Sequence, residues 1–115
     1  MKRGDIVLVS FPQPDGKLKI RPGLVVQSDY YNQRIHNVLV ASITSNLLRQ
    51  SDPAHLLIDL STPQGQLTGL RQDSLVSCLN VTLVAMSSVR QKIGELSPPA
   101  MQQIDSCLKT ALGIV

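Results

Sequence analysis

Apolar residues along this chain fall into short runs separated by turn-forming residues, as in a sheet of short strands. Runs rich in Val, Ile and Leu predict strands at 6–11, 23–28 and 37–43. These runs contain few polar residues at alternate positions, so both faces of the strands need to be covered. The segment 12–21 begins Pro-Gln-Pro-Asp-Gly and is predicted to be a loop. The polar segment 29–37 is predicted to be a loop or a single helical turn.

The second half of the chain continues this pattern with less regularity. The apolar runs predict a strand at 55–60, a strand at 67–76 that pairs back on it with Gly69 at a bend, and a strand at 80–86. Turn residues separate the first two of these strands. The segment from residue 87 to Gly94 fits neither a helix nor a strand clearly.

One helix is predicted, at the C-terminal end. Ser97 is a good N-cap, and Pro98 and Pro99 suit a first helical turn, whose N–H groups lack partners within the helix. Gly113 is a natural stop. Apolar residues recur at spacings of three and four and predict a stripe that packs on the sheet: Met101, Ile104, Leu108, Ala111 and Leu112.

Together these elements predict a mainly β fold, with a small, strongly bent antiparallel sheet or barrel and a C-terminal helix. The chain of 115 residues is long enough for one domain, 1–115. The helix can cover only part of the outer sheet face. A second copy of the chain could cover the rest, so we expect a homodimer.

Composition narrows the possible functions only a little. The net charge of +3 permits a nucleic-acid partner without requiring one. Cys78 and Cys107 have no metal-binding or disulfide-framework spacing, so we expect two buried thiols in a reducing cytoplasm. The apolar run after the N-terminus is too short for a signal peptide or a membrane span, so we expect a cytoplasmic protein.

The sequence carries none of the common catalytic motifs. Neither His36 nor His55 has a second ligand at metal-binding spacing, and both are predicted to be surface or satisfied core residues. The carboxylates are scattered singly, and no phosphate-binding glycine loop is present. We therefore expect no metal and no cofactor. An active site, if there is one, would rely on arginine and hydroxyl groups.

The main candidate for such a site is the basic segment that leads into the second strand. Lys17, Lys19 and Arg21 lie close together, and Pro22 favours an extended conformation for the arginine before it. A guanidinium held in this way is suited to bind a phosphate through two hydrogen bonds. The alternative is a solvated arginine beside an ordinary turn.

Several short motifs occur in an order that resembles the MazF/PemK family of bacterial toxins. They are Arg3-Gly4-Asp5 with the strand after it, Phe11-Pro12, Arg21-Pro22, Ile43-Thr44-Ser45, Gly69-Leu70 with Ser74, and Ile93-Gly94-Glu95-Leu96-Ser97. The resemblance implies a dimeric SH3-like barrel that cleaves single-stranded RNA as a metal-independent endoribonuclease. Its partner would be an antitoxin with a flexible acidic tail, and any DNA contact would be made only through that antitoxin.

The same resemblance assigns roles to individual residues. Arg21 would stabilise the charged phosphorane, and Thr44 would orient the scissile phosphate. From the chemistry of the side chains, we expect Lys17 and Lys19 to attract neighbouring phosphates, and Tyr30 or Tyr31 either to stack a base or to pack under a loop. Hydrogen bonds to base edges are expected from Ser45, Asn46 and Asn80.

Two positions depart from the family pattern. Lys17-Leu18-Lys19 stands where the family often has an acidic residue, and Leu79-Asn80 stands where it often has Asp-Gln. Two alternative functions therefore stay open. One is a non-enzymatic toxin that inhibits a protein target such as a topoisomerase, for example DNA gyrase. The other is a plain barrel-shaped interaction module.

Overall fold

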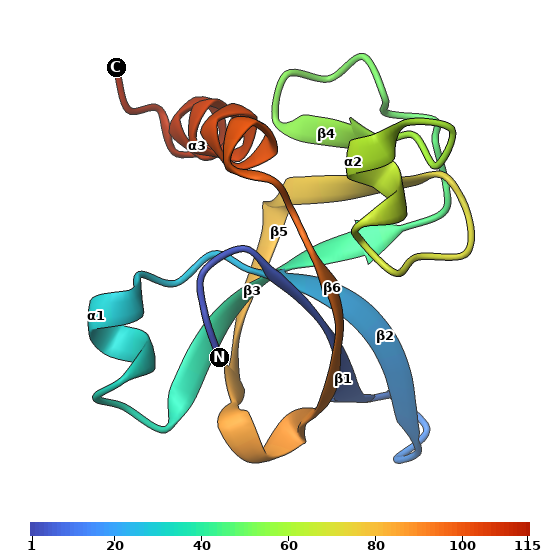
Figure 1. The fold of residues 1–115 in the computed structure, drawn as a ribbon. Helices are drawn as coiled ribbons and strands as arrows, with labels where there is room; N and C mark the ends of the chain where they lie inside the picture. The colour runs from blue at the N-terminus through green and yellow to red at the C-terminus, as the bar shows by residue number, and fades with distance from the viewer.

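A six-stranded antiparallel sheet, bent into an SH3-like barrel, forms the body of the molecule (Figure 1). The computed structural model describes residues 1–115. The strands are β1 (Asp5–Pro12), β2 (Leu18–Val25), β3 (Asn37–Thr44), β4 (His55–Ile58), β5 (Ser74–Ala85) and β6 (Val89–Glu95). The helices are α1 (Asp29–Asn32), α2 (Pro63–Gln66), the 3-10 turn η1 (Met86–Ser88) and α3 (Pro98–Leu112). The strands follow the order β4-β5-β3-β2-β1-β6. The predicted mainly β fold is confirmed.

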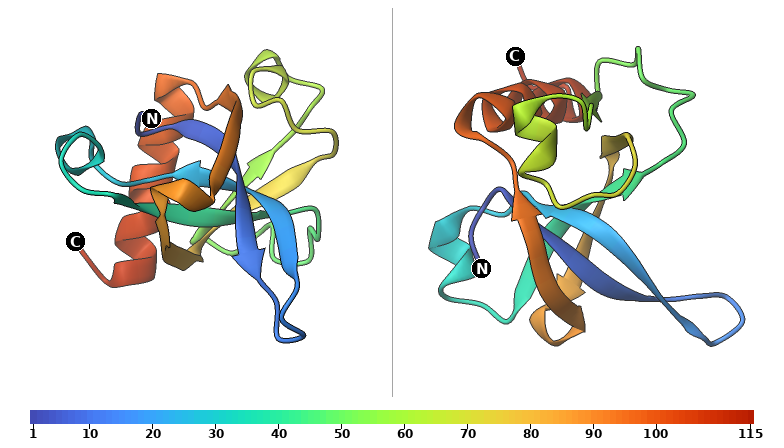
Figure 2. Two further views of the ribbon diagram at one scale, coloured as in Figure 1. Left: turned by 90° about the horizontal axis from the view of Figure 1, so that it is seen from below. Right: turned by 45° about the vertical axis from the view of Figure 1, so that its right-hand side comes forward.

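The inside of the barrel is filled by small branched side chains from three of its strands. Successive side chains of a strand point to opposite faces, so alternate residues of β1, β2 and β3 face inward. These residues form one buried cluster: Val7, Val9, Val25, Val38 and Val40. Phe11, Val84, Met86 and Val89 close its edges. Figure 2 shows β1, β2 and β6 as neighbouring curved strands of the barrel wall.

A second core lies between the outer face of the sheet and α3. Ile104 and Cys107 of α3 are buried against strand residues that include Ile6, Ile43 and Val76. Ser97 caps the helix, because its Oγ accepts the Ala100 N–H at 3.3 Å. The predicted stripe is confirmed for four of its members. Leu112 is an exception, because its side chain is 68% exposed.

The prediction of a loop over 12–21 is wrong for its second half, because β2 already begins at Leu18. Pro22 therefore lies inside a strand, although proline has no N–H to give to a sheet. It is tolerated because β3 pairs with β2 only from Gly23 onward, so Pro22 faces a partner strand on one side only. There it lies opposite Leu8 of β1.

The second half of the chain also departs from its prediction. Residues 63–66 form α2, and β5 starts only at Ser74, so no strand runs over 67–76. β5 then continues as one strand through the region predicted as a separate strand at 80–86. A bulge interrupts it, because Ala41 faces Val81 whereas the next residue, Ser42, faces Ser77.

Gly69 provides the bend expected of it, with φ of +71°. A Cβ at this position would overlap the Ile93 carbonyl, so only glycine fits here. The segment 87–94, whose structure the pattern left open, contains η1 and most of β6. β6 pairs with β1 and forms one edge of the sheet. None of the helices is long and apolar enough to cross a membrane.

Candidate phosphate-binding site

The register of the sheet puts Arg21 of β2 and Thr44 of β3 on the same face of adjacent strands. The last cross-strand pair between β2 and β3 joins Gly23 to Ser42. Arg21 and Thr44 lie two residues beyond this pair, one on each strand, where β2 and β3 are no longer paired. Because side chains alternate between faces, both project from the face that carries Gly23 and Ser42. Both residues are exposed.

This face continues the inner face of the barrel. Along β3, Val38 and Val40 point into the barrel, Ser42 is half-buried, and Thr44 emerges at the rim. Along β2, Val25 is inside and Arg21 is at the rim, opposite Val9 of β1. The interior packing therefore fixes the backbone on which both side chains stand.

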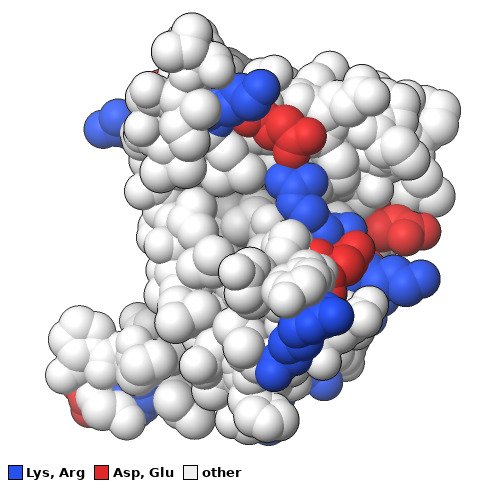
Figure 3. All heavy atoms as spheres, turned by 90° about the vertical axis from the view of Figure 1, so that its left-hand side faces the viewer, with Lys and Arg blue, Asp and Glu red and all other residues white.

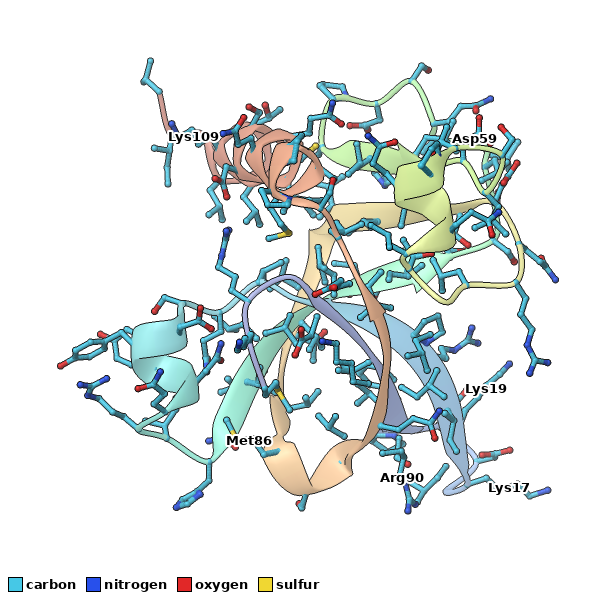
Figure 4. All side chains as sticks on the ribbon, in the orientation of Figure 1. Lys17, Lys19, Asp59, Met86, Arg90 and Lys109 are labelled. Atoms are coloured by element: carbon cyan, nitrogen blue, oxygen red, sulfur yellow. The ribbon has the colours of Figure 1, made fainter.

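The positive charge next to Arg21 is not neutralised. Lys19 lies two residues before Arg21 on the same face, opposite Phe11, and Lys17 lies at the hairpin turn. Figure 4 shows Lys17 and Lys19 pointing into solvent from the β1–β2 hairpin. None of the three basic side chains forms a salt bridge. Their charges are therefore available to an anionic ligand.

Two basic side chains elsewhere in the molecule form ion pairs, Arg3 and Lys92. On the face shown in Figure 3, basic and acidic groups lie next to one another in a band. Ion pairs join Arg3 to Asp105 at 2.7 Å and Lys92 to Asp5 at 3.2 Å. Only these two of the eleven Lys and Arg residues form ion pairs, so the β1–β2 hairpin differs from the rest of the molecule in carrying three of the others within five residues.

The hydroxyl of Thr44 is oriented by the turn that follows β3. Its Oγ1 accepts the Asn46 N–H at 3.1 Å, and the Asn46 Oδ1 in turn accepts the Leu48 N–H at 3.0 Å. These bonds leave the Thr44 hydroxyl proton and the Asn46 amide nitrogen free to donate. Ser45 is exposed between them.

A hollow of about 170 Å³ opens beside Thr44. It is lined by Thr44, Asn46, Leu48, Arg49, His55 and Leu75. Leu75 of β5 pairs with Thr44 of β3 on one side and with Leu57 of β4 on the other, so these side chains share a face of the sheet. His55 lies two residues before Leu57 on β4 and therefore projects from the same face as Thr44. The strand order therefore brings a histidine close to the predicted site.

The prediction that His55 is a surface or satisfied core residue is wrong. Its side chain is only 5% exposed, and its Nδ1 lies 3.6 Å from Asp52 Oδ1. That distance is too long for a hydrogen bond, so the buried nitrogen has no partner. The carboxylate three residues before the histidine was the one sequence signal for this arrangement. His36, in contrast, is exposed as predicted.

Other predicted residues lie apart from the hollow. Asn80 is exposed on the β5 bulge and does not line it. Tyr30 and Tyr31 lie on α1, which Figure 1 shows at the opposite side of the molecule from the β1–β2 hairpin. They are 60% and 52% exposed, so neither packs under a loop. They contact each other edge to face, with the Arg34 guanidinium 3.8 Å from the centre of the Tyr30 ring.

The two thiols take no part in this site. Cys78 and Cys107 are free and buried together between the sheet and α3, as predicted. Burial raises the pKa of Cys78 to about 12, so its thiol stays protonated near neutral pH and is a poor nucleophile. The groups that can interact with an anion on the inner sheet face are thus guanidinium, ammonium, hydroxyl and amide.

Fold and geometry together describe a small β-barrel protein whose inner sheet face ends in a basic hairpin and an exposed threonine hydroxyl. The chain belongs to the family described as PemK-like, MazF-like toxin of type II toxin-antitoxin system, whose model matches residues 2–112. This confirms the resemblance inferred from the motifs. The departures at Lys17-Leu18-Lys19 and Leu79-Asn80 therefore lie within a genuine member of the family.

Sequence relatives and solved structures agree with this assignment. The chain is 29% identical to endoribonuclease MazF6 of Mycobacterium tuberculosis over 99% of this chain and 98% of that protein. It is 26% identical to endoribonuclease MazF of Staphylococcus saprophyticus, over 99% and 92%. A mycobacterial endoribonuclease solved in complex with its cognate antitoxin has the same fold, with a TM-score of 0.80, 21% identity, and coverage of 100% of this chain and 97% of the other.

Proposed function

We propose that this chain is the toxin of a type II toxin–antitoxin pair and cleaves single-stranded RNA as a metal-independent endoribonuclease. The observation that carries the proposal is the placement of Arg21 and Thr44 on one face of adjacent strands, each two residues beyond the last β2–β3 pair, with Lys17 and Lys19 nearby and free of ion pairs. The relatives named endoribonucleases support RNA as the substrate. They favour RNA cleavage over inhibition of a topoisomerase such as DNA gyrase.

In this reaction the ribose 2′-oxygen attacks the adjacent phosphorus and the bond to the 5′-oxygen of the next nucleotide breaks. The products are a 2′,3′-cyclic phosphate and a free 5′-hydroxyl. Negative charge grows on the nonbridging oxygens, and Arg21 stabilises it with paired hydrogen bonds that are strongest in the transition state. Thr44 donates its free hydroxyl proton to the same phosphate and keeps it in line for attack.

The flanking residues bind the rest of the RNA. Lys17 and Lys19 contact neighbouring phosphates and supply affinity that depends on salt rather than on sequence. Ser45 and Asn46, next to Thr44, hydrogen-bond base edges. Asn80 hydrogen-bonds a base edge only when the bound RNA extends as far as the β5 bulge.

The partners follow from the same function. A cognate antitoxin neutralises the toxin by binding over the RNA site, and DNA is contacted only through that antitoxin. The protein works as a homodimer of single-domain chains, 1–115, in the cytoplasm, where its RNA substrates are found. The apolar strip formed by Leu39, Val81 and Leu83 is exposed on the outer face of β3 and β5, with Leu79 exposed on the neighbouring bulge, and supports a dimer interface there.

The test is a comparison of wild type with Arg21→Ala on long, varied RNAs in the presence of a chelator, with new 5′ ends mapped by sequencing. We expect the wild type to cleave and Arg21→Ala to lose on the order of a hundredfold or more in rate. Arg34→Ala, at an exposed arginine just after α1, should leave the rate unchanged. Unchanged cleavage by Arg21→Ala would refute the assigned role. Growth inhibition without any cleavage would favour the topoisomerase alternative.

A further inference from the structure

The two cysteines of the chain are reactive groups that the proposed RNA chemistry does not use. They come from separate elements, Cys78 from β5 and Cys107 from α3, and both thiols are free and buried. We propose that they are the site of one intramolecular disulfide, formed by reaction with a peroxide, which joins α3 to β5 and stabilises the fold against heat. The inference does not depend on RNA cleavage, so its failure and that of the proposed function are separate results.

The periodicity of the two elements places the thiols on facing surfaces. Cys78 lies two residues after Val76 on β5, so both side chains point to the outer face of the sheet. Cys107 lies three residues after Ile104 on α3, so both side chains share the face of the helix that packs on the sheet. All four residues belong to one buried cluster, in which Cys78 is 3% and Cys107 is 6% exposed.

The two thiols are also neighbours within this cluster. Cα atoms of α3 and β5 come within 8 Å of one another, and a disulfide spans a Cα separation of about 4.4–6.8 Å. Burial raises the pKa of Cys78, and Cys107 raises it further through its charge and through a hydrogen bond between the side chains. Such an interaction requires that the two sulfur atoms lie close together.

The strand β5 is irregular where Cys78 stands. Ser77 pairs with Ser42 of β3 and the next paired residue is Val81, so residues 78–80 have no partner on β3. The Cys78 N–H donates instead to the Ala54 carbonyl at 3.0 Å. A bulged backbone adjusts to the fixed dihedral geometry of a disulfide more easily than a regular strand does.

The oxidation balances with hydrogen peroxide as the oxidant. One thiol loses its proton and its sulfur attacks a peroxide oxygen, so the O–O bond breaks and the leaving hydroxide takes up the proton as water. The second thiol then attacks the sulfenic sulfur, the S–S bond forms, and the hydroxyl group leaves as a second water. Because both thiols are buried, the reaction requires a transient separation of α3 from the sheet and should be slow in the folded protein.

A disulfide at these positions should stabilise the protein mainly through its effect on the unfolded chain. It would close a loop of roughly 30 residues, which lowers the conformational entropy of the unfolded chain. For a domain of this size the corresponding rise in Tm is on the order of 10 °C. The bond would lie on the outer face of the sheet, away from the inner face that carries Arg21 and Thr44.

The wild-type chain can be tested directly, because it has only two cysteines. After incubation with hydrogen peroxide, we expect protein that is lighter by two hydrogen atoms and runs as a monomer on a non-reducing denaturing gel. Trypsin should release residues 72–90 joined to residues 93–109. Thermal unfolding should show the higher Tm, and dithiothreitol should reverse the changes in mass and Tm. Thiols that stay reduced, gain oxygen separately or link two chains would overturn the inference, as would a disulfide that does not raise the Tm.

Cys107→Ala is the matched control, because it keeps Cys78 and removes its partner. We expect peroxide to leave the Tm of this variant without the rise seen in wild type. Cys78→Ala serves the same purpose if Cys107→Ala does not fold. A rise in either variant equal to that in wild type would show that a bond between the two cysteines is not the cause.

Discussion

Arg21 and Thr44 illustrate how much a single residue's role depends on strand register. The motifs around both residues pointed to them through the family resemblance, and the unusual Arg-Pro order gave a physical reason for the first. Nothing in the spacing of the sequence says that positions 21 and 44 lie on the same face of adjacent strands. That follows only from the pairing of Gly23 with Ser42, which sets the alignment of β2 against β3.

His55 shows the opposite case, a residue whose importance the sequence did not reveal. A histidine at the start of an apolar run is compatible with a surface site, a satisfied core site or a ligand site. Burial of the side chain, the unpaired Nδ1 and the nearby Thr44 depend on β4 pairing with β5 on the correct face. Long-range pairing of this kind is not encoded in local periodicity.

At Thr44 the hydroxyl can be separated from the shape of the side chain. Thr44→Val keeps the volume but removes the hydroxyl, and with it both the donor to the phosphate and the acceptor of the Asn46 N–H. We expect the cleavage rate to fall about tenfold or more, since one lost hydrogen bond of about 1.4 kcal/mol is tenfold in rate. Thr44→Ser keeps the hydroxyl and should retain most of the activity. Single-turnover kinetics on a defined RNA measure both variants. Equal rates for Val and Ser would show that the hydroxyl has no role.

Among the elements, α3 was well predicted because its cap, proline pair and apolar periodicity are all local signals. β2 was less well predicted because the turn chemistry of Pro-Gln-Pro-Asp-Gly suggested a longer loop than the hairpin needs. Pro22 strengthened that impression, although proline is acceptable in a strand with only one partner. The prediction of a strand at 67–76 was wrong because a short apolar run does not distinguish a strand from a loop that packs on the core.

The lysines of the β1–β2 hairpin, Lys17 and Lys19, lie close enough together to contact neighbouring phosphates of one nucleic-acid backbone. Each phosphate contact with single-stranded RNA contributes about 0.7 to the slope of log affinity against log salt. A Lys17→Ala, Lys19→Ala double variant should therefore lower the slope by about 1.4. Lys109→Ala, at the far end of α3 in Figure 4, removes a charge without that effect. Fluorescence titrations of a 2′-fluoro oligonucleotide over a salt series give the slopes. A slope that does not change in the double variant would remove the lysines from the RNA site.

Two separate apolar clusters stabilise the molecule as a whole. One fills the barrel and fixes the strands that carry Arg21 and Thr44, and the other attaches α3 to the outer face. A bent sheet whose outer face is only partly covered by the helix could be predicted from two features of the sequence. These are the number of short strands and the small number of polar residues at alternate positions within them. Which part stays uncovered could not be predicted, since it depends on where α3 crosses the sheet.

The uncovered part makes the homodimer testable. Leu39 and Leu83 are paired across β3 and β5 on the outer face, and Leu83 is 56% exposed. In a two-fold symmetric interface a single substitution is present twice, so Leu83→Glu would place two unpaired carboxylates against an apolar surface. We expect light scattering to give a dimer for wild type and a monomer for Leu83→Glu at the same concentration. Leu67→Glu, at an exposed leucine beside α2, should remain a dimer. A Leu83→Glu dimer as stable as wild type would place the interface elsewhere, because an apolar contact surface cannot accept two buried charges without weakening.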